Sequence, residues 1–159
     1  MLVKNFITLE QQAELLAWAS SLPEFNEPNF AFIETISNVP LCLNLIRQNC
    51  LKIDGNKVYS KSIVSDFVLS VPVGISINTH VDGTTNCNFD GKIGNYKHTR
   101  FVVLLQKPTL GGELIVNNET ILMDELDCFV LNTAFEHELS KVDGMKNYIS
   151  IVFVFEFEF

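Results

Sequence analysis

The C-terminal segment, residues 148–159, restricts the fold of this chain more than any other part of the sequence. It reads YISIVFVFEFEF, with a phenylalanine at every second position from Phe153 to Phe159 and Glu156 and Glu158 between them. Because successive side chains of a β-strand point to opposite faces, this period predicts a strand with one aromatic face. An uncovered aromatic face would cause aggregation, so we expect other parts of the chain to cover it.

The whole region after residue 55 is predicted to be a β domain. Short runs rich in Val, Ile, Phe and Thr are separated by Gly, Asn, Asp and Pro, as in strands joined by turns. The expected strands lie near residues 57–60, 62–70, 73–79, 99–106, 113–116, 120–123, 128–132 and 146–158. Eight strands suit a double-sheet jelly roll, also called a double-stranded β-helix. Residues 82–98 have no hydrophobic period and hold three of the eight glycines, which predicts a long mobile loop.

Two helices are predicted before the strands. Thr8-Leu9-Glu10-Gln11 has the form of a capping box and starts a helix over about 9–20. The apolar face expected for it consists of Leu9, Ala13, Leu16 and Ala17, with Trp18 buried beside them.

The second helix is expected after Pro40, a residue that suits a first helical turn. Its apolar positions are Leu41, Leu45 and Ile46, and Gly55 lies beyond its end. The predicted fold class is therefore mainly β with N-terminal helices (α+β). One domain covers 1–159, with a helical support region at 1–55 and a jelly-roll core at 56–159.

Charge and hydropathy disfavour several classes of protein. The 11 Lys and Arg against 19 Asp and Glu give a net charge of -8, which disfavours nucleic acid as a partner. The longest apolar run, residues 151–155, is far shorter than the ~20 residues of a membrane span. The N-terminus lacks the pattern of a signal peptide, so a cytoplasmic location is expected. The four cysteines form no CxxC pair and are expected to be reduced, mostly buried thiols.

The three histidines of the sequence limit any metal or acid-base proposal to a small set. His80 and Asp82 form an HxD pair at the end of a predicted strand, where residues two apart share a face. His137 could supply a second imidazole from another strand. Two histidines and one carboxylate leave metal positions open, as in non-haem Fe(II) oxygenases, whereas a structural zinc site uses four ligands. Each histidine alone also fits a hydrogen-bonded structural role.

Lys146 follows His137 by nine residues at the start of the terminal strand. A cation near a metal site could pair with the far carboxylate of a dicarboxylate such as 2-oxoglutarate, while its 2-oxo acid end chelates the metal. Taken alone, Lys146 also fits a solvated lysine in a turn.

These residues stand in an order that resembles the prolyl 4-hydroxylase-like branch of the Fe(II)/2-oxoglutarate dioxygenases. The resemblance covers most of the chain. The segments that carry it are VKNFITLEQQAELLAWA at 3–19, VPVGISINTHVD at 71–82, RFVVLLQ at 100–106, GGEL at 111–114 and HELSKVDGMKNYISIVF at 137–153.

The resemblance implies His80, Asp82 and His137 as Fe(II) ligands and Lys146 as the partner of the far carboxylate of 2-oxoglutarate. Ser150, four residues further, could give this cosubstrate a hydroxyl or could be an ordinary core or surface serine. The family's reaction takes up O2, converts 2-oxoglutarate to succinate and CO2, and hydroxylates a substrate. Ascorbate is an optional further cofactor.

Two features depart from the family pattern. Many relatives have a tyrosine where Val71 stands and another in the strand that here reads VVLLQ, so both hydroxyls are missing. The chain also stops soon after the core, which leaves substrate specificity to loops. Candidate substrate residues are Arg100, which could bind a substrate carboxylate or form a strand-edge salt bridge, and Tyr96 in the predicted loop. His98 is expected to be an exposed loop residue.

Three classes of function are compatible with these residues. The leading prediction is a dioxygenase that hydroxylates a protein or peptide side chain, with a free amino acid or small metabolite as the alternative substrate. A non-catalytic jelly-roll binding module is the second reading, supported by the missing tyrosines. A cupin-like or isomerase enzyme with another metal ranks last, because it leaves Lys146 without a role. The oligomeric state does not follow from the sequence.

Overall fold

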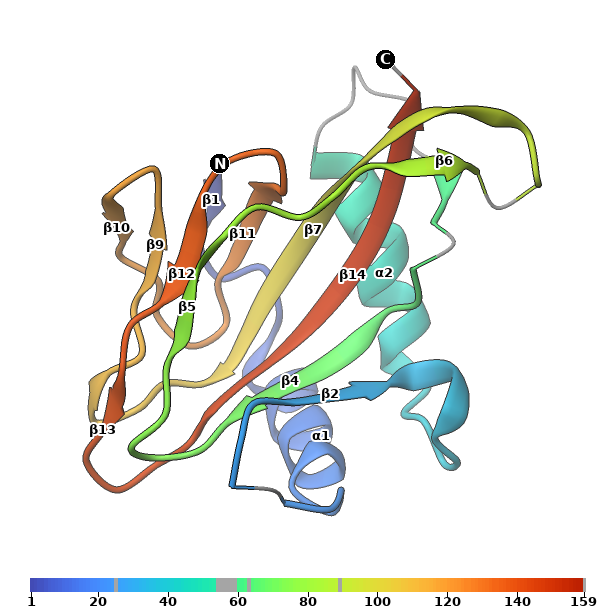
Figure 1. Cartoon of the computed structure of the whole chain (residues 1–159). Coiled ribbons are helices and arrows are strands. Elements are labelled where there is room, and N and C mark those ends of the chain that lie inside the picture. Colours follow the sequence, from blue (N-terminus) through green and yellow to red (C-terminus); the bar gives the residue numbers. More distant parts are fainter. Residues whose placement is uncertain (25, 54–59, 63, 89, 159) are drawn as a thin grey trace.

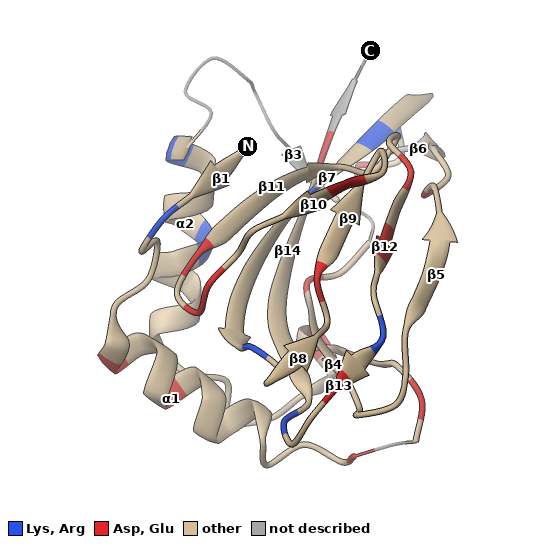
Figure 2. Ribbon diagram, turned by 90° about the vertical axis from the view of Figure 1, so that its left-hand side faces the viewer, with Lys and Arg blue, Asp and Glu red and all other residues tan. Residues whose placement is uncertain are grey.

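A computed structural model describes residues 1–24, 26–53, 60–62, 64–88 and 90–158 of the chain. Its main feature is a pair of antiparallel sheets that face each other, with two helices packed on the outer side of the larger sheet (Figure 1). Figure 2 shows these three layers from the side, in the order helices, larger sheet and smaller sheet. No helix in the described ranges is long and apolar enough to cross a membrane.

The larger sheet contains eight of the described strands. Its path runs through β1 (Leu2–Val3), β11 (Cys128–Asn132), β7 (Ile93–Gln106), β14 (Tyr148–Glu158), β4 (Phe67–Val71) and β2 (Asn29–Phe32), while β3 (Ser60–Lys61) pairs with β14 and β6 (Thr85–Cys87) with β7. The smaller sheet has the order β10 (Glu119–Ile121), β9 (Leu114–Val116), β12 (His137–Leu139) and β5 (Ile77–His80). A separate pair consists of β8 (Leu110–Gly111) and β13 (Val142–Asp143).

The two longest strands, β7 and β14, form the centre of the larger sheet. Phe153 pairs with Phe101 in their register, and the ring of Phe155 packs edge-on against Phe101 at 5.4 Å. All three side chains are at most 1% exposed and belong to the core beneath the helices. Each such burial contributes about 1.5–3 kcal/mol. The prediction of a covered aromatic face is confirmed for Phe153 and Phe155, whereas the side chains of residues 157–159 lie outside the described part.

Helix α1 (Leu9–Ala19) begins with the predicted capping box, in which Thr8 Oγ1 accepts from the Gln11 N–H and the Gln11 side chain accepts from the Thr8 N–H. The predicted buried face was wrong at Leu9, Ala13 and Ala17. Leu15 and Ala19 are buried, whereas Leu9 is 72% exposed and Ala13 is exposed. Gln12 also reaches the sheet, where its Nε2 donates to the Leu105 carbonyl at 2.7 Å, whereas Leu9 at the helix start extends into solvent.

The neighbouring residues Leu16 and Trp18 are partly buried and pack against the same core, in agreement with the role expected for Trp18. Ala17 is exposed, so it lies outside the buried face that the sequence predicted.

Helix α2 (Cys42–Ile53) follows Pro40 as predicted, but its apolar stripe also differs from the expected one. The buried residues are Leu43, Ile46 and Cys50, which follow the spacing i, i+3, i+7. Leu41 is 89% exposed because it precedes the helix, and Leu45 is 51% exposed. The predicted stop at Gly55 lies outside the described residues.

Several strand boundaries correct the expectations. The prediction of one long loop over 82–98 is wrong, because β6 and the first part of β7 occupy residues 85–87 and 93–98 and pair with each other. Strand β5 is shorter than the predicted strand 73–79 and starts at Ile77, β4 occupies only the end of 62–70, and 57–60 falls mostly outside the described residues. The predicted helical support region 1–55 also contributes β1 and β2 to the larger sheet.

The cysteines agree with the prediction where they are described. Cys42, Cys50 and Cys128 are free, and the last two are fully buried. Burial raises the pKa of Cys50 and raises that of Cys42 to about 11, so these thiols stay protonated and unreactive at neutral pH. The side chain of Cys87 is not among the described ones.

Candidate metal centre

Strands β5 and β12 bring the two candidate histidine ligands together. His80 is the last residue of β5 and His137 the first of β12, and the antiparallel register places them directly opposite each other. Their rings lie 4.3 Å apart between centroids. The backbone N–H of Asp82 donates to the Thr133 carbonyl at 3.0 Å, which fixes the carboxylate two residues beyond the strand end.

The three candidate ligands converge on one point. Asp82 Oδ1 lies 3.7 Å from His80 Nε2 and 3.9 Å from His137 Nε2. One ligand atom from each residue lies within 4.8 Å of the other two. Two imidazole nitrogens and one carboxylate oxygen in this arrangement suit a divalent transition metal with open coordination positions. The sequence prediction named this set, and the structure places its members together.

The hydrogen bonds of the two histidines orient their free nitrogens toward this point. His80 Nδ1 lies 2.7 Å from the Asn78 carbonyl, and His137 Nδ1 lies 2.8 Å from the Phe135 carbonyl. A carbonyl oxygen only accepts, so each Nδ1 carries the hydrogen and each Nε2 presents a lone pair. His137 Nε2 is buried and has no hydrogen-bond partner among the described residues. An unsatisfied buried acceptor of this kind fits a metal ligand.

Burial also favours the ligating form of His137. Its side chain is 5% exposed, and loss of solvation lowers its pKa, although the hydrogen bond to the Phe135 carbonyl acts in the opposite direction. The imidazole is therefore neutral near pH 7, as metal binding requires. The His80 side chain is 39% exposed, so the cluster opens to solvent on the β5 side.

Arg100 occupies the other side of the Asp82 carboxylate. Its Nη2 lies 2.6 Å from Asp82 Oδ2, which leaves Oδ1 facing the two histidines. The guanidinium also lies over the Phe67 ring at 5.5 Å. Burial lowers the pKa of Arg100, and Asp82 opposes that effect. From the sequence, Arg100 could bind a substrate carboxylate or form a strand-edge salt bridge, and here its carboxylate partner is Asp82.

A small, mainly apolar cavity of about 60 Å³ adjoins the cluster. Among the described residues that line it, His80, His137, Arg100 and Glu138 carry polar groups, and Tyr148 adds a phenol at the inner wall. The remaining lining is apolar: Phe30, Phe67, Leu69, Ile77, Val102, Leu114, Leu131, Leu139 and Val152. The volume is below the ~300–1,000 Å³ of typical small-molecule pockets, so ligands of that size require the cavity to widen.

The structure does not bring Lys146 to this cavity. Lys146 is exposed in the turn between β13 and β14 and lines a different depression, together with Ala19 and Ser20 at the end of α1. Ser150, the other predicted cosubstrate residue, is fully buried on β14 beside Tyr148.

Tyr148 is a site residue that the sequence reasoning missed. It lines the cavity and pairs across the sheet with Val71. Burial raises the pKa of Tyr148 to about 12, an effect that Ser150 partly offsets. The phenol is therefore protonated at neutral pH and can donate a hydrogen bond. Its place in the site follows from the register of β4 with β14, which the sequence does not reveal.

The two residues predicted in the 82–98 loop lie inside the molecule. Tyr96 is 2% exposed on β7. His98 is 4% exposed, and its Nδ1 lies 3.0 Å from Ser62 Oγ. The expectation of an exposed His98 was wrong because the segment around it is a strand of the larger sheet and not a surface loop.

Comparison with solved structures shows that this fold is known. A viral collagen prolyl hydroxylase from Paramecium bursaria Chlorella virus-1, solved with 2-oxoglutarate, has a TM-score of 0.74 at 14% identity, over 98% of this chain and 94% of that chain. HygX from Streptomyces hygroscopicus, solved with nickel, 2-oxoglutarate and hygromycin B, has a TM-score of 0.70 at 13% identity, over 98% and 81% of the two chains.

A prolyl-4-hydroxylase from Pseudomonas putida has a TM-score of 0.65 at 11% identity, over 100% of this chain and 92% of that chain. No protein-family model and no curated protein matches the sequence.

Proposed function

We propose that this chain, which has the fold of the 2OG-Fe(II) oxygenases, is an Fe(II)- and 2-oxoglutarate-dependent dioxygenase that hydroxylates a protein or peptide side chain. The observation that carries the proposal is the convergence of His80, Asp82 and His137, whose Nε2 atoms lie 3.7 and 3.9 Å from Asp82 Oδ1. The proposal includes a single domain over 1–159 and closure of the two sheets as a jelly roll.

The residues of the cluster would hold Fe(II) through His80 Nε2, Asp82 Oδ1 and His137 Nε2. When bound, the metal supplies the chemistry that couples O2 and 2-oxoglutarate to hydroxylation. Arg100 holds Asp82 in one orientation through its contact with Oδ2. The apolar lining of the cavity excludes water, which strengthens charge interactions inside it.

The proposed cosubstrate residues are Lys146, Ser150 and, from the structure, Tyr148. The hydroxyls of Tyr148 and Ser150 lie on the inner face of β14, where they can donate to a carboxylate. Tyr148 stands opposite Val71, the position at which many relatives carry a tyrosine, so it can replace that hydroxyl from the neighbouring strand. Lys146 is two residues before Tyr148, and its flexible stem would have to turn toward the cavity.

The test of this proposal is a titration of the Fe(II)-loaded protein with 2-oxoglutarate without oxygen, followed by admission of O2 and a succinate assay. We expect a visible metal-to-ligand absorption band and slow succinate formation, both lost in His137→Ala. His98→Gln, which changes a buried histidine outside the cluster, is the matched control. A folded protein that gives neither band nor succinate would instead support a non-catalytic binding module, which the small cavity favours.

The alternative substrate class, a free amino acid or small metabolite, is compatible with the same cluster. HygX is solved with hygromycin B bound, so a protein of this fold binds a small molecule. A screen of amino acids and peptides for increased succinate formation separates the two classes.

A further inference from the structure

The outer edge of β2 presents backbone groups that its own sheet does not use. In the described sheet order, β2 is the last strand and pairs only with β4. The Ile33 N–H donates to the Asp66 carbonyl at 2.9 Å, directly beyond the Phe32–Phe67 pair. Hydrogen-bonded and non-hydrogen-bonded pairs alternate in an antiparallel ladder, so the pairs that contain Phe30 and Phe32 are non-hydrogen-bonded. The N–H groups of these two residues therefore point away from β4, toward the open edge.

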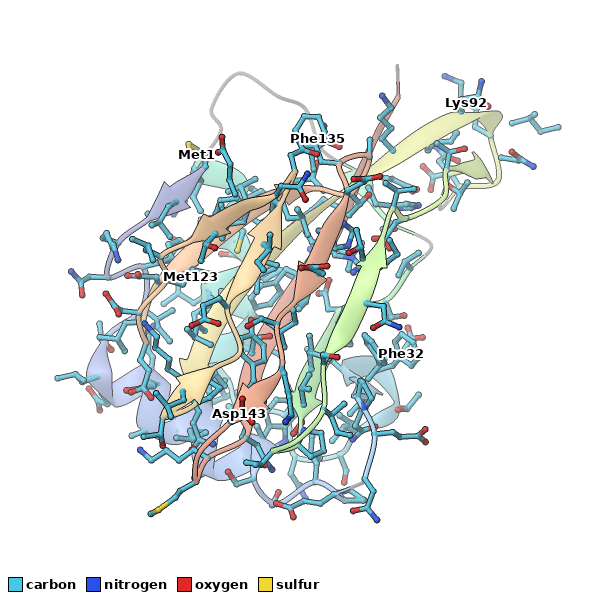
Figure 3. All side chains as sticks on the ribbon, turned by 60° about the vertical axis from the view of Figure 1, so that its left-hand side comes forward. Met1, Phe32, Lys92, Met123, Phe135 and Asp143 are labelled. Carbon is cyan, nitrogen blue, oxygen red and sulfur yellow. The ribbon has the colours of Figure 1, made fainter. Side chains whose placement is uncertain are left out.

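The side chains of the same two residues form an aromatic surface that leads to the metal centre. Phe30 and Phe32 are each 43% exposed, and both rings pack edge-on against Phe67, at 5.5 and 6.2 Å. Phe30 and Phe67 line the cavity that His80 and Arg100 also line. Figure 3 shows Phe32 on the β5 side of the molecule, the side on which the cluster opens to solvent. Neighbouring exposed aromatic rings are typical of binding surfaces.

The residues that flank β2 in the sequence carry only negative charge, whereas Lys146, from the turn before β14, lines a depression together with Glu24, Asn29 and Ala31. Residues 5–46 contain five glutamates and no lysine or arginine, and Figure 2 shows only acidic charges on α1 within this range. Glu24, Glu27 and Glu34, on both sides of β2, are exposed. This distribution complements a positively charged partner.

We propose that β2 binds an extended, basic peptide segment as an added strand, and that this segment carries an apolar residue over Phe30 and Phe67 into the cavity. The inference rests on the proposed function and names its substrate class. Strand addition uses backbone hydrogen bonds for affinity, and alternate side chains of the peptide then face the same side as Phe30 and Phe32. Lysine or arginine residues beside the apolar residue would meet Glu27 and Glu34.

The first experiment measures binding without turnover, by fluorescence anisotropy with the metal-free full chain. The probes are two fluorescein-labelled ten-residue peptides with a central leucine, one with lysines and the other with glutamates at the flanking positions. We expect binding of the lysine peptide only, with affinity that falls as salt increases. Equal binding of both peptides, or of neither, would overturn the inference.

A pair of variants at Phe32 isolates the backbone contact. Phe32 has φ -67°, a value that proline adopts without strain. Phe32→Ala removes the ring, and Phe32→Pro removes the ring and the outward N–H. We expect the proline variant to bind the lysine peptide about fivefold more weakly than the alanine variant, the effect of one hydrogen bond. Leu9→Ala, at a position 72% exposed on α1, is the control and should bind as the wild type does.

Circular dichroism melting shows whether the proline variant is folded. If it is not folded, hydrogen exchange of the wild type tests the backbone contact instead. The bound peptide should slow exchange of the Phe30 and Phe32 amides. Equal affinity of the two variants, or unchanged exchange at both amides, would exclude strand addition.

The same peptides separate this inference from the proposed function. Succinate formation that responds to a small molecule and to neither peptide would leave the dioxygenase in place and overturn the peptide substrate. Peptide binding at β2 in a protein that forms no succinate would overturn the dioxygenase and retain the binding site.

Discussion

The two carboxylate oxygens of Asp82 have different neighbours: Oδ2 lies 2.6 Å from Arg100 Nη2, while Oδ1 faces the two histidines. The arginine therefore fixes the orientation in which the carboxylate can ligate a metal. The same contact gives Asp82 a structural role in the metal-free protein. The Arg100 side chain is only 21% exposed, so its charge needs a counter-charge.

We expect Asp82→Ala to lower the free energy of unfolding by about 2 kcal/mol as well as to abolish metal binding. This is less than the ~3–5 kcal/mol of a fully buried pair, because both side chains retain some contact with solvent. The Arg100→Met variant should regain stability when Fe(II) or Mn(II) is added, because the metal can neutralise Asp82. The Asp82→Ala variant should not be stabilised by either metal. Urea unfolding of both single variants and the double variant measures the coupling. Independent, additive effects would argue against the pair.

Tyr148→Phe removes one hydroxyl and keeps the ring that fills the inner wall of the cavity. We expect 2-oxoglutarate to bind about tenfold more weakly, the effect of one hydrogen bond to a charged group, with metal affinity unchanged. Lys146→Ala should also weaken 2-oxoglutarate binding without affecting the metal. Calorimetric titration of both variants compares the two contributions. An unchanged 2-oxoglutarate affinity in either variant would remove that residue from the cosubstrate site.

The metal-free protein should lose stability as the pH falls below about 6.5. Burial lowers the pKa of both His98 and His137 below their ordinary value of 6.5. Between the lowered pKa values of the folded protein and 6.5, the unfolded chain binds more protons than the folded chain. The stabilisation that comes from the neutral imidazoles is therefore complete above pH 6.5 and declines as the pH falls below it. Urea unfolding at pH 7.5 and 5.5 measures the change. His98→Gln should reduce the pH dependence, and an unchanged dependence would contradict the role of His98.

Among the glycines that the structure describes, Gly111 is the one where an added Cβ atom would lie nearest to another atom. It has φ +66°, and a Cβ atom there would lie 1.9 Å from the Lys141 carbonyl oxygen. We expect Gly111→Ala to lower the free energy of unfolding by about 2 kcal/mol or more through backbone strain and loss of the β8–β13 pairing. Gly83→Ala is the control, because a Cβ atom there meets no other atom within 4 Å. Equal thermal stability of the two variants would show that β8 can move to accommodate the methyl group.

The grouping of His80, Asp82 and His137 could be predicted from the sequence because metal binding requires particular residue types. His80, Asp82 and His137 belong to the few residues that ligate a transition metal, and their order resembles a known family. Tyr148 could not be found in this way, since its place opposite Val71 depends on the register between β4 and β14. The position of Lys146 also depended on a turn whose direction the sequence does not specify.

The errors in the fold have a common physical cause. The segment 82–98 is polar and rich in glycine, so it shows no hydrophobic period, and its strands depend on pairing with each other and with β14. In α1 and α2, several apolar residues lie outside the buried stripe, including Leu9 and Leu45. Tertiary packing selected the stripe that faces the sheet, and helical spacing alone could not distinguish it from the neighbouring ones.

A metal bound at this site would have a second role, in holding strand β5. This strand is four residues long, stands at the edge of the smaller sheet, and pairs in the described part of the chain with β12 alone. His80 and His137 belong to these two strands, so one ion would link β5 to β12. Without the ion, β5 would separate more easily and expose the chain to proteases. The lifetime of this protein in a cell would then depend on the supply of iron.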